Sequence, residues 1–453
     1  MKVAAFKRCA PDRDEERPFA VRRGSLTSGH KQAAEPNEES EMTGKKLRIG
    51  MIGIGVGGAE ILRAMDGMDT IELVAGADVV PATLERFKER FPDARTYLSA
   101  EELCRDANVD AVWVSSPNRF HAEHTILAAR HGKHIVVEKP MAVSLDQARA
   151  MVEAAEQHGV HLLAGHTRAF TLPIRAMRKV ITSGHYGDLR ALNIWSYSDW
   201  MLRPRTADEL DIAQGGGIPF RQGPHQIDTV RLLGGGLVRS VRAQTGAWMK
   251  ERSIPGYYAA FLEFENGLPA TIVHNGYGYF LGAELVPWGT DKQVYTATQR
   301  GDIRRALRAG SRDETSEKQS IRIGGQRERD YFYSGDNDPW WPEDMGMAIA
   351  SLDRADLRQS PFGLFIHDDD GKHDVEVVKK HEMGHVQRRA ELEELYDAVF
   401  NGKPLWHNGR WGLATLEVCL ALMQSAKERK EIMLQHQVAV APGYDADMST
   451  PRV

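Results

Sequence analysis

The stretch of sequence that decides the fold is Leu47–Gly58, LRIGMIGIGVGG. An apolar run ends at Ile52, a GxGxxG turn follows, and helical spacing of apolar residues begins at Ala59. A strand, a glycine turn and a helix in this order form the phosphate-binding start of a Rossmann fold, because the helix amino terminus attracts a pyrophosphate. A tight turn that binds nothing is the alternative. The residues expected to contact a dinucleotide here are Gly53, Ile54, Gly55, Val56 and Gly58.

The next apolar run, Ile71–Ala77, ends at Asp78, which stands 20 residues beyond Gly58. An acid at this point accepts hydrogen bonds from the ribose hydroxyls of NAD, and it repels the 2′-phosphate of NADP. The two residues that follow are Val79 and Val80, so no arginine stands beside Asp78 to bind that phosphate. The sequence therefore predicts NAD as the cofactor in preference to NADP.

Strands and helices continue to alternate up to residue 166. Ser99 and Ser144 have the spacing of helix N-caps, and each precedes an amphipathic stretch. The alternation predicts a parallel sheet with right-handed crossovers, so we assign residues 46–166 to an NAD-binding Rossmann domain. The further strands expected in this sheet are 110–116, 134–137 and 160–164.

Beyond Gly165 the pattern changes to longer strands joined by tight turns. Residues 259–274 have a hairpin pattern around Asn266-Gly267, and residues 364–378 repeat it around Asp370-Gly371. These hairpins predict an α+β domain with a large, mostly antiparallel open sheet. The expected fold class is therefore α/β, with a Rossmann domain first, a substrate-binding and oligomerisation domain at residues 167–435, and a flexible tail at 436–453.

Composition narrows the class of protein. The 453 residues are 42% hydrophobic and 27% charged, with a net charge of -5, which fits globular domains and gives no reason to expect nucleic acid or an anionic membrane as partner. No apolar run approaches the roughly 18 residues of a membrane span. Cys9, Cys104 and Cys419 are too far apart for a disulfide framework or a thiolate metal site. We expect a cytoplasmic protein.

The first 45 residues are polar and charged and show almost no apolar periodicity. Such a segment cannot bury enough apolar surface to offset the entropy of ordering it. It has no apolar signal segment, and acids such as Asp12 and Glu15 oppose a mitochondrial transit peptide. We expect residues 1–45 to be a disordered extension, with Met42 as an alternative start of translation.

Three later motifs carry a family resemblance: residues 116–121 (SPNRFH), residues 138–140 (EKP) and residues 216–228 (GGIPFRQGPHQID). Together with the glycine turn, they resemble the Gfo/Idh/MocA family of oxidoreductases over about residues 47–435. The resemblance implies that the second domain packs against a partner subunit, so we expect a homo-oligomer, either a dimer or a tetramer. The residues that it places on the nicotinamide side of the cofactor are Ser116, Pro117, Asn118, His121, Glu138 and Lys139.

The same resemblance implies the groups that move protons. Lys139 corresponds to the catalytic lysine of such enzymes, and His225 corresponds to the histidine of the second-domain motif. A surface lysine after a strand and a capping histidine at a helix end are the alternatives. Which of the two residues is the base stays open.

Arg221 departs from the family pattern, which commonly has an aspartate four residues before the motif histidine. A fixed cation there indicates a small anionic substrate, and residues 217–226 resemble the phthalate 4,5-cis-dihydrodiol dehydrogenase branch. We expect Arg221 to clamp a substrate carboxylate beside Gln222, with Arg168 and Arg203 as further candidates. The alternative is that Arg221 pairs with an internal acid such as Asp228.

The resulting hypothesis is an NAD-dependent dehydrogenase that oxidises a carboxylated cyclohexadiene cis-diol to a catechol. Lys139 or His225 would take the hydroxyl proton. Two alternatives are a sugar or polyol dehydrogenase of the same family and a non-enzymatic dinucleotide-binding regulator.

Three segments are interpreted as having no catalytic role. Residues 381–385 (HEMGH) match the zinc motif HExxH, but Gly384 weakens a helix there, so we expect no metal. Residues 291–330 mix acids with bases and are expected to be an exposed insertion. The aromatic residues of 331–341 are expected to pack.

Overall fold

A computed structural model describes residues 44–288, 295–327, 342, 345–377 and 386–447. Residues 46–453 cluster as one unit, separate from residues 1–45. The expected disordered extension, the aromatic stretch 331–341 and the HExxH match at 381–385 lie outside the described residues, so these expectations stay predictions.

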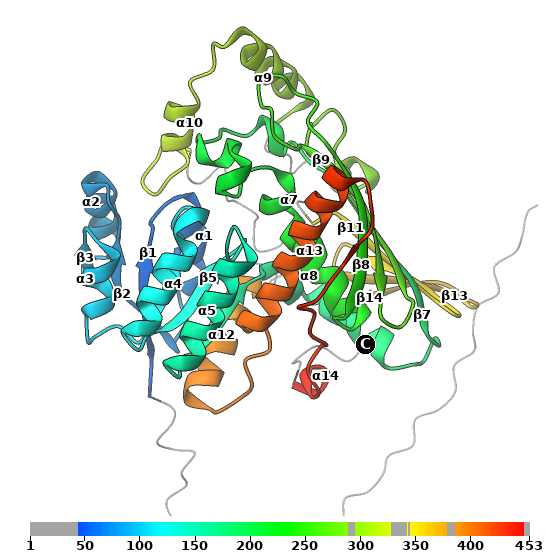
Figure 1. The fold of residues 1–453 in the computed structure, drawn as a ribbon, viewed down its shortest axis with the longest axis horizontal. Coiled ribbons are helices and arrows are strands. Elements are labelled where there is room, and N and C mark those ends of the chain that lie inside the picture. The colour runs from blue at the N-terminus through cyan, green and yellow to red at the C-terminus, as the bar shows by residue number, and fades with distance from the viewer. Residues whose placement is uncertain (1–43, 289–294, 328–341, 343–344, 378–385, 448–453) are drawn as a thin grey trace, which may run out of the picture. The chain divides into compact units, whose positions relative to one another are not determined.

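The first sheet has six parallel strands in the order β3-β2-β1-β4-β5-β6 (Figure 1). The order reverses between β1 and β4, and a crevice at such a switch point is where open α/β sheets bind ligands. The strands are β1 (Leu47–Ile52), β2 (Ile71–Ala77), β3 (Arg95–Tyr97), β4 (Ala111–Val114), β5 (His134–Glu138) and β6 (Leu162–Gly165). The predicted Rossmann fold is confirmed.

The helices of this half connect the strands as crossovers. Ser99 accepts a hydrogen bond from the backbone of Glu102, and Ser144 accepts one from the backbone of Gln147, so both predicted N-caps are present. The helices are α1 (Val56–Met65), α2 (Pro81–Arg90), α3 (Ala100–Arg105), α4 (His121–Arg130) and α5 (Leu145–Gln157).

The second sheet has nine strands in the order β14-β13-β12-β11-β7-β10-β9-β8-β15. All neighbours are antiparallel except β7 and β10, so the predicted mostly antiparallel sheet is confirmed. The strands are β7 (Leu189–Tyr197), β8 (Val238–Gly246), β9 (Tyr257–Phe264), β10 (Pro269–Asn275), β11 (Met347–Leu352), β12 (Asp356–Gln359), β13 (Gly363–Asp368), β14 (Gly371–Glu376) and β15 (Ile432–Met433). Both predicted hairpins, β9–β10 and β13–β14, are present.

Helices cover one face of this sheet. Along β7 the side chains alternate, so that Leu192 and Ile194 are buried while Trp195 is 44% exposed on the other face. The buried strand residues and the covering helices form one hydrophobic cluster. The helices of this half are α6 (Leu172–Thr182), α7 (Ile218–Arg221), α8 (Gly223–Gly234) and α13 (Gly409–Glu428), with short turns η3 (Thr167–Phe170), η4 (Trp200–Leu202), η5 (Asp208–Leu210), η6 (Ile212–Gln214) and η7 (Gly282–Leu285).

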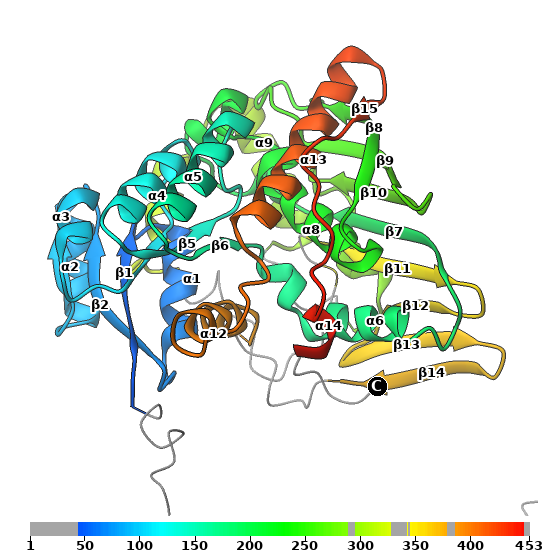
Figure 2. The same ribbon diagram turned by 60° about the horizontal axis from the view of Figure 1, so that its bottom comes forward.

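The carboxy-terminal helices return to the first half of the chain (Figure 2). In α12 (Val386–Phe400), Leu392 and Leu395 belong to the same buried cluster as Ile61 and Leu62 of α1. Helix α13 packs on both α5 and β8. The boundary expected at residue 166 therefore divides the two sheets along the chain. The carboxy-terminal helices α12 and α13, however, pack against the first half as well.

Residues 295–327, the described part of the expected exposed insertion, are mostly exposed or half-buried and bury only a few side chains. They form α9 (Ala297–Ala309) and α10 (Glu314–Ser320), and the side chain of Arg300 is 2% exposed. Charged side chains of α10 pair with the second half, because Glu314 binds Arg252 at 2.6 Å and Lys318 binds Glu209 at 2.8 Å. The mixed charges reflect these buried ion pairs as well as a solvated surface.

Part of the expected flexible tail is also packed. Tyr444, at the start of α14 (Tyr444–Asp447), is 4% exposed. The carboxylate of Asp445 accepts two hydrogen bonds from the guanidinium of Arg178, each 2.8 Å long. Packing and a bidentate ion pair hold this end of the chain.

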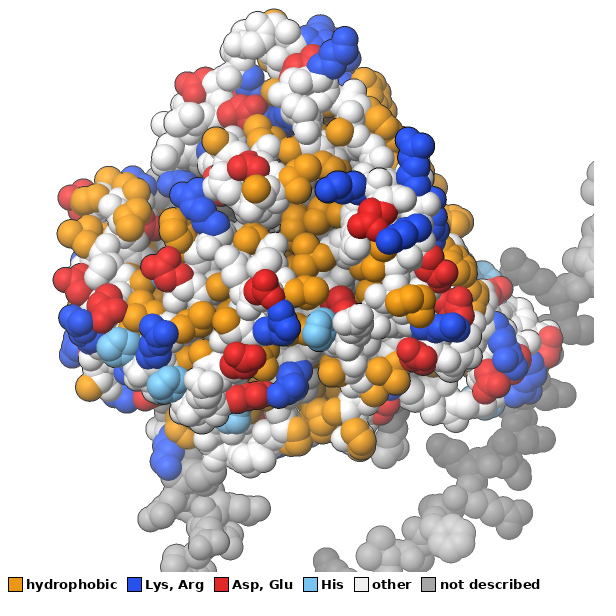
Figure 3. All heavy atoms as spheres, viewed as in Figure 1, with side chains coloured by type: hydrophobic (Ala, Val, Ile, Leu, Met, Phe, Trp, Pro, Cys, Tyr) orange, Lys and Arg blue, Asp and Glu red, His pale blue; other side chains and the backbone are white. Residues whose placement is uncertain are grey.

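The surface gives two further observations. Acidic and basic side chains are interspersed over the face in view in Figure 3. Within the described ranges, no helix is both long enough and apolar enough to cross a membrane.

Candidate active site

The three glycines of the turn have three different surroundings. Gly53 has a φ of +88°, and a Cβ there would lie 2.7 Å from the backbone nitrogen of Ser116. A Cβ on Gly58 would lie 3.0 Å from Met51 and 3.1 Å from the Gly53 carbonyl oxygen. At Gly55 no atom lies within 4 Å of the place that a Cβ would occupy, so this side of the turn faces open space. This open cradle at the start of α1 fits a pyrophosphate.

Asp78 lies at the end of β2, beside this turn. Its Oδ2 accepts a hydrogen bond from the backbone N–H of Ile54, and its Oδ1 accepts one from the backbone N–H of Val80, both 2.9 Å long. Ile54 is fully buried, and Val79 points outward with 82% exposure. The side chain of Val56 is not described, although its backbone begins α1. The carboxylate is thus fixed at the edge where a ribose would lie.

His121 joins the two loops that follow β4 and β5. One ring nitrogen lies 2.9 Å from the Pro140 carbonyl oxygen, and the other lies 2.8 Å from the Ser116 carbonyl oxygen. The ring is 1% exposed, and burial lowers the pKa of His121. Both ring nitrogens face backbone carbonyls and join the loops that carry Asn118 and Lys139. The expected place of His121 on the nicotinamide side of the cofactor stays a prediction.

Lys139 reaches from the end of β5 into the second half of the chain. Its Nζ donates a hydrogen bond to the backbone carbonyl of Arg221 at 2.8 Å. The residue is half-buried, and its peptide bond to Pro140 is cis. The alternative of a surface lysine is therefore wrong.

His225 lies in the first turn of α8 and is 6% exposed. Its Nδ1 is buried without a hydrogen-bond partner among the described residues. Burial, followed by the positive charges of Lys139, Arg168 and Arg388, holds the pKa of His225 well below its ordinary value. The ring is therefore neutral at physiological pH.

Arg168 and Arg388 bring further positive charge to His225. Arg168 comes from η3 and donates to Gln387 at 3.4 Å. Arg388, from α12, pairs with Glu138 at 2.8 Å and with Glu391 at 3.1 Å. The sequence indicated Arg168 but not Arg388, because α12 follows the motifs by more than 150 residues and carries no motif of its own.

Arg221 has an internal acid as partner, which is the alternative that the sequence left open. Its Nη2 binds Glu209 at 2.9 Å, and its Nη1 donates to the side-chain oxygen of Asn118 at 2.9 Å. The acid is Glu209 and not Asp228, which is fully buried and accepts a hydrogen bond from Trp411. The expected clamp is therefore already bound to protein groups through both terminal nitrogens.

Four other residues were also expected in the site. Gln222, the residue that precedes α8, is 5% exposed, and its Oε1 has no hydrogen-bond partner among the described residues. Arg203 pairs with Asp199 at 2.9 Å, in a contact within one turn of chain. Ser116 is buried with its hydroxyl 2.9 Å from His124, whereas Pro117 is exposed.

The described residues hold no group of three or more His, Cys, Asp or Glu side chains arranged to bind a metal ion. The segment 381–385 lies outside the described residues. What the site does present is a dinucleotide cradle, a lysine and a neutral histidine, with two arginines close to the histidine. These groups can support hydride transfer coupled to proton transfer.

Comparison with known proteins agrees with this geometry. Residues 47–166 match the oxidoreductase family with an NAD-binding Rossmann fold, and residues 174–280 match the GFO/IDH/MocA C-terminal domain. A solved structure from Bordetella bronchiseptica RB50 is 32% identical, with a TM-score of 0.77, and the match covers 86% of this chain and 100% of that one.

Two curated relatives cover most of the chain. The 1-carboxy-3-chloro-3,4-dihydroxycyclohexa-1,5-diene dehydrogenase of Comamonas testosteroni is 30% identical over 87% of this chain and 98% of its own length. The scyllo-inositol 2-dehydrogenase (NADP⁺) of Bacillus subtilis is 23% identical over 86% of this chain and 96% of its own. Homologues of this kind are dehydrogenases, and the chain is an enzyme. It belongs to the Gfo/Idh/MocA family of oxidoreductases.

Proposed function

We propose that this enzyme uses NAD to oxidise a carboxylated cyclohexadiene cis-diol to a catechol. The observation that carries the proposal is the neutral, buried His225 with Lys139, Arg168 and Arg388 around it. A site of this kind favours an anion that carries a hydroxyl group. The name of the Comamonas relative describes a substrate of this class, with a ring carboxylate beside a diol.

The cofactor half of the site fits NAD. The backbone at Gly53, Gly55 and Gly58 and the start of α1 would hold the pyrophosphate, while Asp78 would bind the ribose hydroxyls. The side chain of Asn118 and the backbone of Ser116 and Pro117 would border the nicotinamide. The dinucleotide, when bound, accepts a hydride. The preference for NAD over NADP rests on Asp78 and on the absence of an arginine at positions 79 and 80.

Arg168 is the partner that we assign to the substrate carboxylate. Arg388 pairs with Glu138 and Glu391, and Arg221 pairs with Glu209. The planar guanidinium of Arg168 can bind a carboxylate through two nitrogens, which orients a flat ring. The free Oε1 of Gln222 can accept a hydrogen bond from a substrate hydroxyl.

His225 is the group that we assign to proton removal. Its low pKa makes it a weak base in the free enzyme, because the ring is buried and because Lys139, Arg168 and Arg388 place positive charge near it. A bound carboxylate would offset part of this charge and raise the pKa of His225, so an anionic substrate would activate its own base. The Lys139 ammonium would stabilise the developing oxyanion.

The chemistry balances without a further reactant. The carbinol carbon loses a hydride and its hydroxyl loses a proton, which leaves a hydroxy-dienone. This ketone enolises to the catechol by moving a ring proton to oxygen. The gain of aromaticity makes the overall oxidation nearly irreversible.

We also propose that the enzyme is a homo-oligomer formed through the second sheet. Trp195 and Phe261 are 44% and 45% exposed. Their partners in β10 are Val273 and Thr271, which are two residues apart, so both aromatic rings lie on the face away from the helices. Light scattering of the native protein should give a dimer or tetramer mass, and a monomer at micromolar concentration would contradict this.

A substrate panel tests the proposed function. Purified enzyme with NAD is offered carboxylated cyclohexadiene cis-diols, scyllo- and myo-inositol, and sugar acids, and formation of reduced nicotinamide is followed by absorbance. The proposal expects the highest kcat/KM on a carboxylated cis-diol, with a catechol as product. Preference for an inositol or sugar would instead support the polyol alternative. The absence of turnover on every compound would support the regulator alternative.

A further inference from the structure

Glu209 is a buried acid that the proposed chemistry does not use. It lies on η5 and is 4% exposed. Its Oε1 accepts from Arg205 at 3.1 Å and from Arg221 at 2.9 Å. Its Oε2 accepts from Lys318 at 2.8 Å and from the backbone and hydroxyl of Thr206 at 2.9 and 3.0 Å. Five donors therefore fix one carboxylate.

The carboxylate is charged at neutral pH. Burial alone would raise its pKa, but Arg205, Arg221 and Lys318 together hold the pKa of Glu209 well below the usual value. A buried charged group is stable only when its hydrogen-bonding atoms have partners, and both carboxylate oxygens of Glu209 have donors. Glu209 is thus a rigid anchor for the guanidinium of Arg221.

Arg221, which Glu209 holds, forms hydrogen bonds with two groups of the candidate active site. Its Nη1 donates to Asn118, which belongs to the loop expected at the nicotinamide. Its backbone carbonyl accepts the hydrogen bond of Lys139. A single residue therefore touches Glu209, Asn118 and Lys139.

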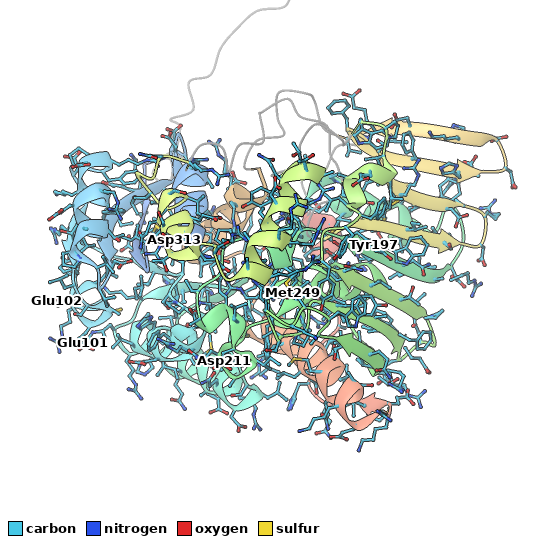
Figure 4. All side chains as sticks on the ribbon, turned by 90° about the horizontal axis from the view of Figure 1, so that it is seen from above. Glu101, Glu102, Tyr197, Asp211, Met249 and Asp313 are labelled. Carbon is cyan, nitrogen blue, oxygen red and sulfur yellow. The ribbon has the colours of Figure 1, made fainter. Side chains whose placement is uncertain are left out.

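The chain around Glu209 is fixed against the same loop. The amide of Asn118 donates to the Gly215 carbonyl at 3.0 Å. A Cβ on Gly216 would lie 2.5 Å from the Glu209 carbonyl oxygen, so only glycine allows this approach. Figure 4 labels Asp211, which caps η6 in this segment, and Asp313, which caps α10. Helix α10 is the one that supplies Lys318.

We propose that Glu209 is a positioning residue for hydride transfer. It holds the Arg221 guanidinium against Asn118 and so fixes the loop expected at the nicotinamide, and Lys318 couples α10 to this arrangement. Glu209 itself does not touch substrate. The proposal rests on the oxidoreductase activity of the family, and it uses the carboxylated cis-diol of the proposed function only as a probe.

A double-mutant cycle tests the proposal. Glu209→Gln keeps the shape of the side chain and removes its charge, and Arg221→Lys keeps the charge but cannot reach both Glu209 and Asn118. Each single variant should lower kcat by about 10-fold or more, since a charge-assisted hydrogen bond is worth about that factor, while the KM for the diol changes less than about 3-fold. Because both changes break one linkage, the double variant should be no slower than the slower single variant.

Asp445→Asn is the matched control. It breaks the carboxylate–guanidinium pair with Arg178 in the same half of the chain, away from the site. It should lower the thermal midpoint as the other variants do, but leave kcat within about 2-fold of the parent. A drop in kcat equal to that of Glu209→Gln would show that any lost ion pair slows the enzyme.

Three results would overturn the proposal. One is unchanged kcat in folded Glu209→Gln, and another is a double variant whose loss equals the product of the single losses. The third is Arg221→Lys raising the KM for the carboxylated diol alone with kcat unchanged, which would make Arg221 a substrate ligand. If Glu209→Gln does not fold, Arg221→Lys decides alone by the split between kcat and KM. If the parent oxidises only a polyol, the proposed function fails and the cycle is measured on that polyol.

Discussion

The Nζ of Lys139 lies 2.8 Å from the backbone carbonyl oxygen of Arg221 and donates a hydrogen bond to it. The contact joins the end of a Rossmann strand to the motif of the second sheet domain. Because the acceptor is a backbone atom, the lysine is placed by the path of the chain, and the side chain of Arg221 is left to hold Asn118. The position of the lysine therefore depends on the two halves staying together.

Lys139 should be needed for chemistry more than for cofactor binding. Lys139→Met removes the ammonium and keeps most of the packing, so kcat/KM should fall by at least about 10²-fold, the range of one proton-transfer or oxyanion-stabilising group. NAD affinity, measured by fluorescence quenching or calorimetry, should change less than about 3-fold. A variant that retains turnover within a few-fold of the parent would remove Lys139 from the mechanism.

Asp78 should set the choice of cofactor. Asp78→Ser with Val79→Arg removes the repulsion of a 2′-phosphate and adds a partner for it, at a position that is 82% exposed and free of packing. The ratio of kcat/KM for NAD to that for NADP should fall by at least about 10²-fold, which combines the two effects. The same ratio in parent and variant would mean that Asp78 is not at the ribose.

Arg168 should distinguish carboxylated from uncarboxylated substrates. Loss of one charge-assisted contact costs about 1.5 to 3 kcal/mol, so Arg168→Met should lower kcat/KM for the carboxylated cis-diol by roughly 10- to 150-fold. The uncarboxylated analogue should be affected less than about 3-fold. Arg203→Met, which breaks the pair with Asp199, is the control and should not change the ratio of the two substrates. Equal losses on both substrates in Arg168→Met would assign that arginine to folding or cofactor binding.

Glu391 should make stability depend on pH. It is fully buried, and burial, with a contribution from Glu138 that opposes Arg388, raises its pKa from 4.5 to about 7. Between these values the folded protein holds a proton that the unfolded chain releases, so the free energy of unfolding should fall as pH rises through this interval. The loss is at most about 3 kcal/mol, at 1.36 kcal/mol per unit.

Glu391→Gln removes this titration and keeps the shape. Urea unfolding at several pH values from about 4.5 to about 7.5 should show the variant gaining on the parent as pH rises, with the two closest at the acid end. Parallel curves for parent and variant would place the pKa of Glu391 in its ordinary range.

Local patterns were enough to predict the Rossmann half. Strand and helix alternation and the glycine turn are short-range features, and the predicted run Leu47–Ile52 is the observed β1. The hairpins were predictable for the same reason, because Asn-Gly and Asp-Gly dipeptides such as Asn266-Gly267 and Asp370-Gly371 favour tight hairpin turns by themselves. The return of α12 to α1 was not predictable, since amphipathic spacing does not say which partner a helix covers.

The same limit applies to the site: its residues could be predicted from local patterns, but their partners could not. The motif residues come from four stretches whose order in the chain is diagnostic, so their identity was predictable. The partners of those residues were not. Glu209 and Arg388 stand in segments without a motif, and only the fold brings Glu209 to Arg221 and Arg388 to Glu138. This is why the sequence predicted neither the pair of Arg221 with Glu209 nor the ion pairs that α10 forms with the second half.

The most direct test of the account is the ratio of kcat/KM for a carboxylated cyclohexadiene cis-diol to that for the same diol without the carboxylate, measured with NAD and the parent enzyme near neutral pH. An anion-binding site that also activates His225 predicts a ratio of about 10-fold or more, the value of one charge-assisted contact. It also predicts that the acid limb of the kcat profile lies at lower pH for the uncarboxylated diol, because the charge that raises the pKa of His225 is missing. A ratio near one, with identical pH profiles, would contradict the claim that the cations around His225 bind a substrate carboxylate.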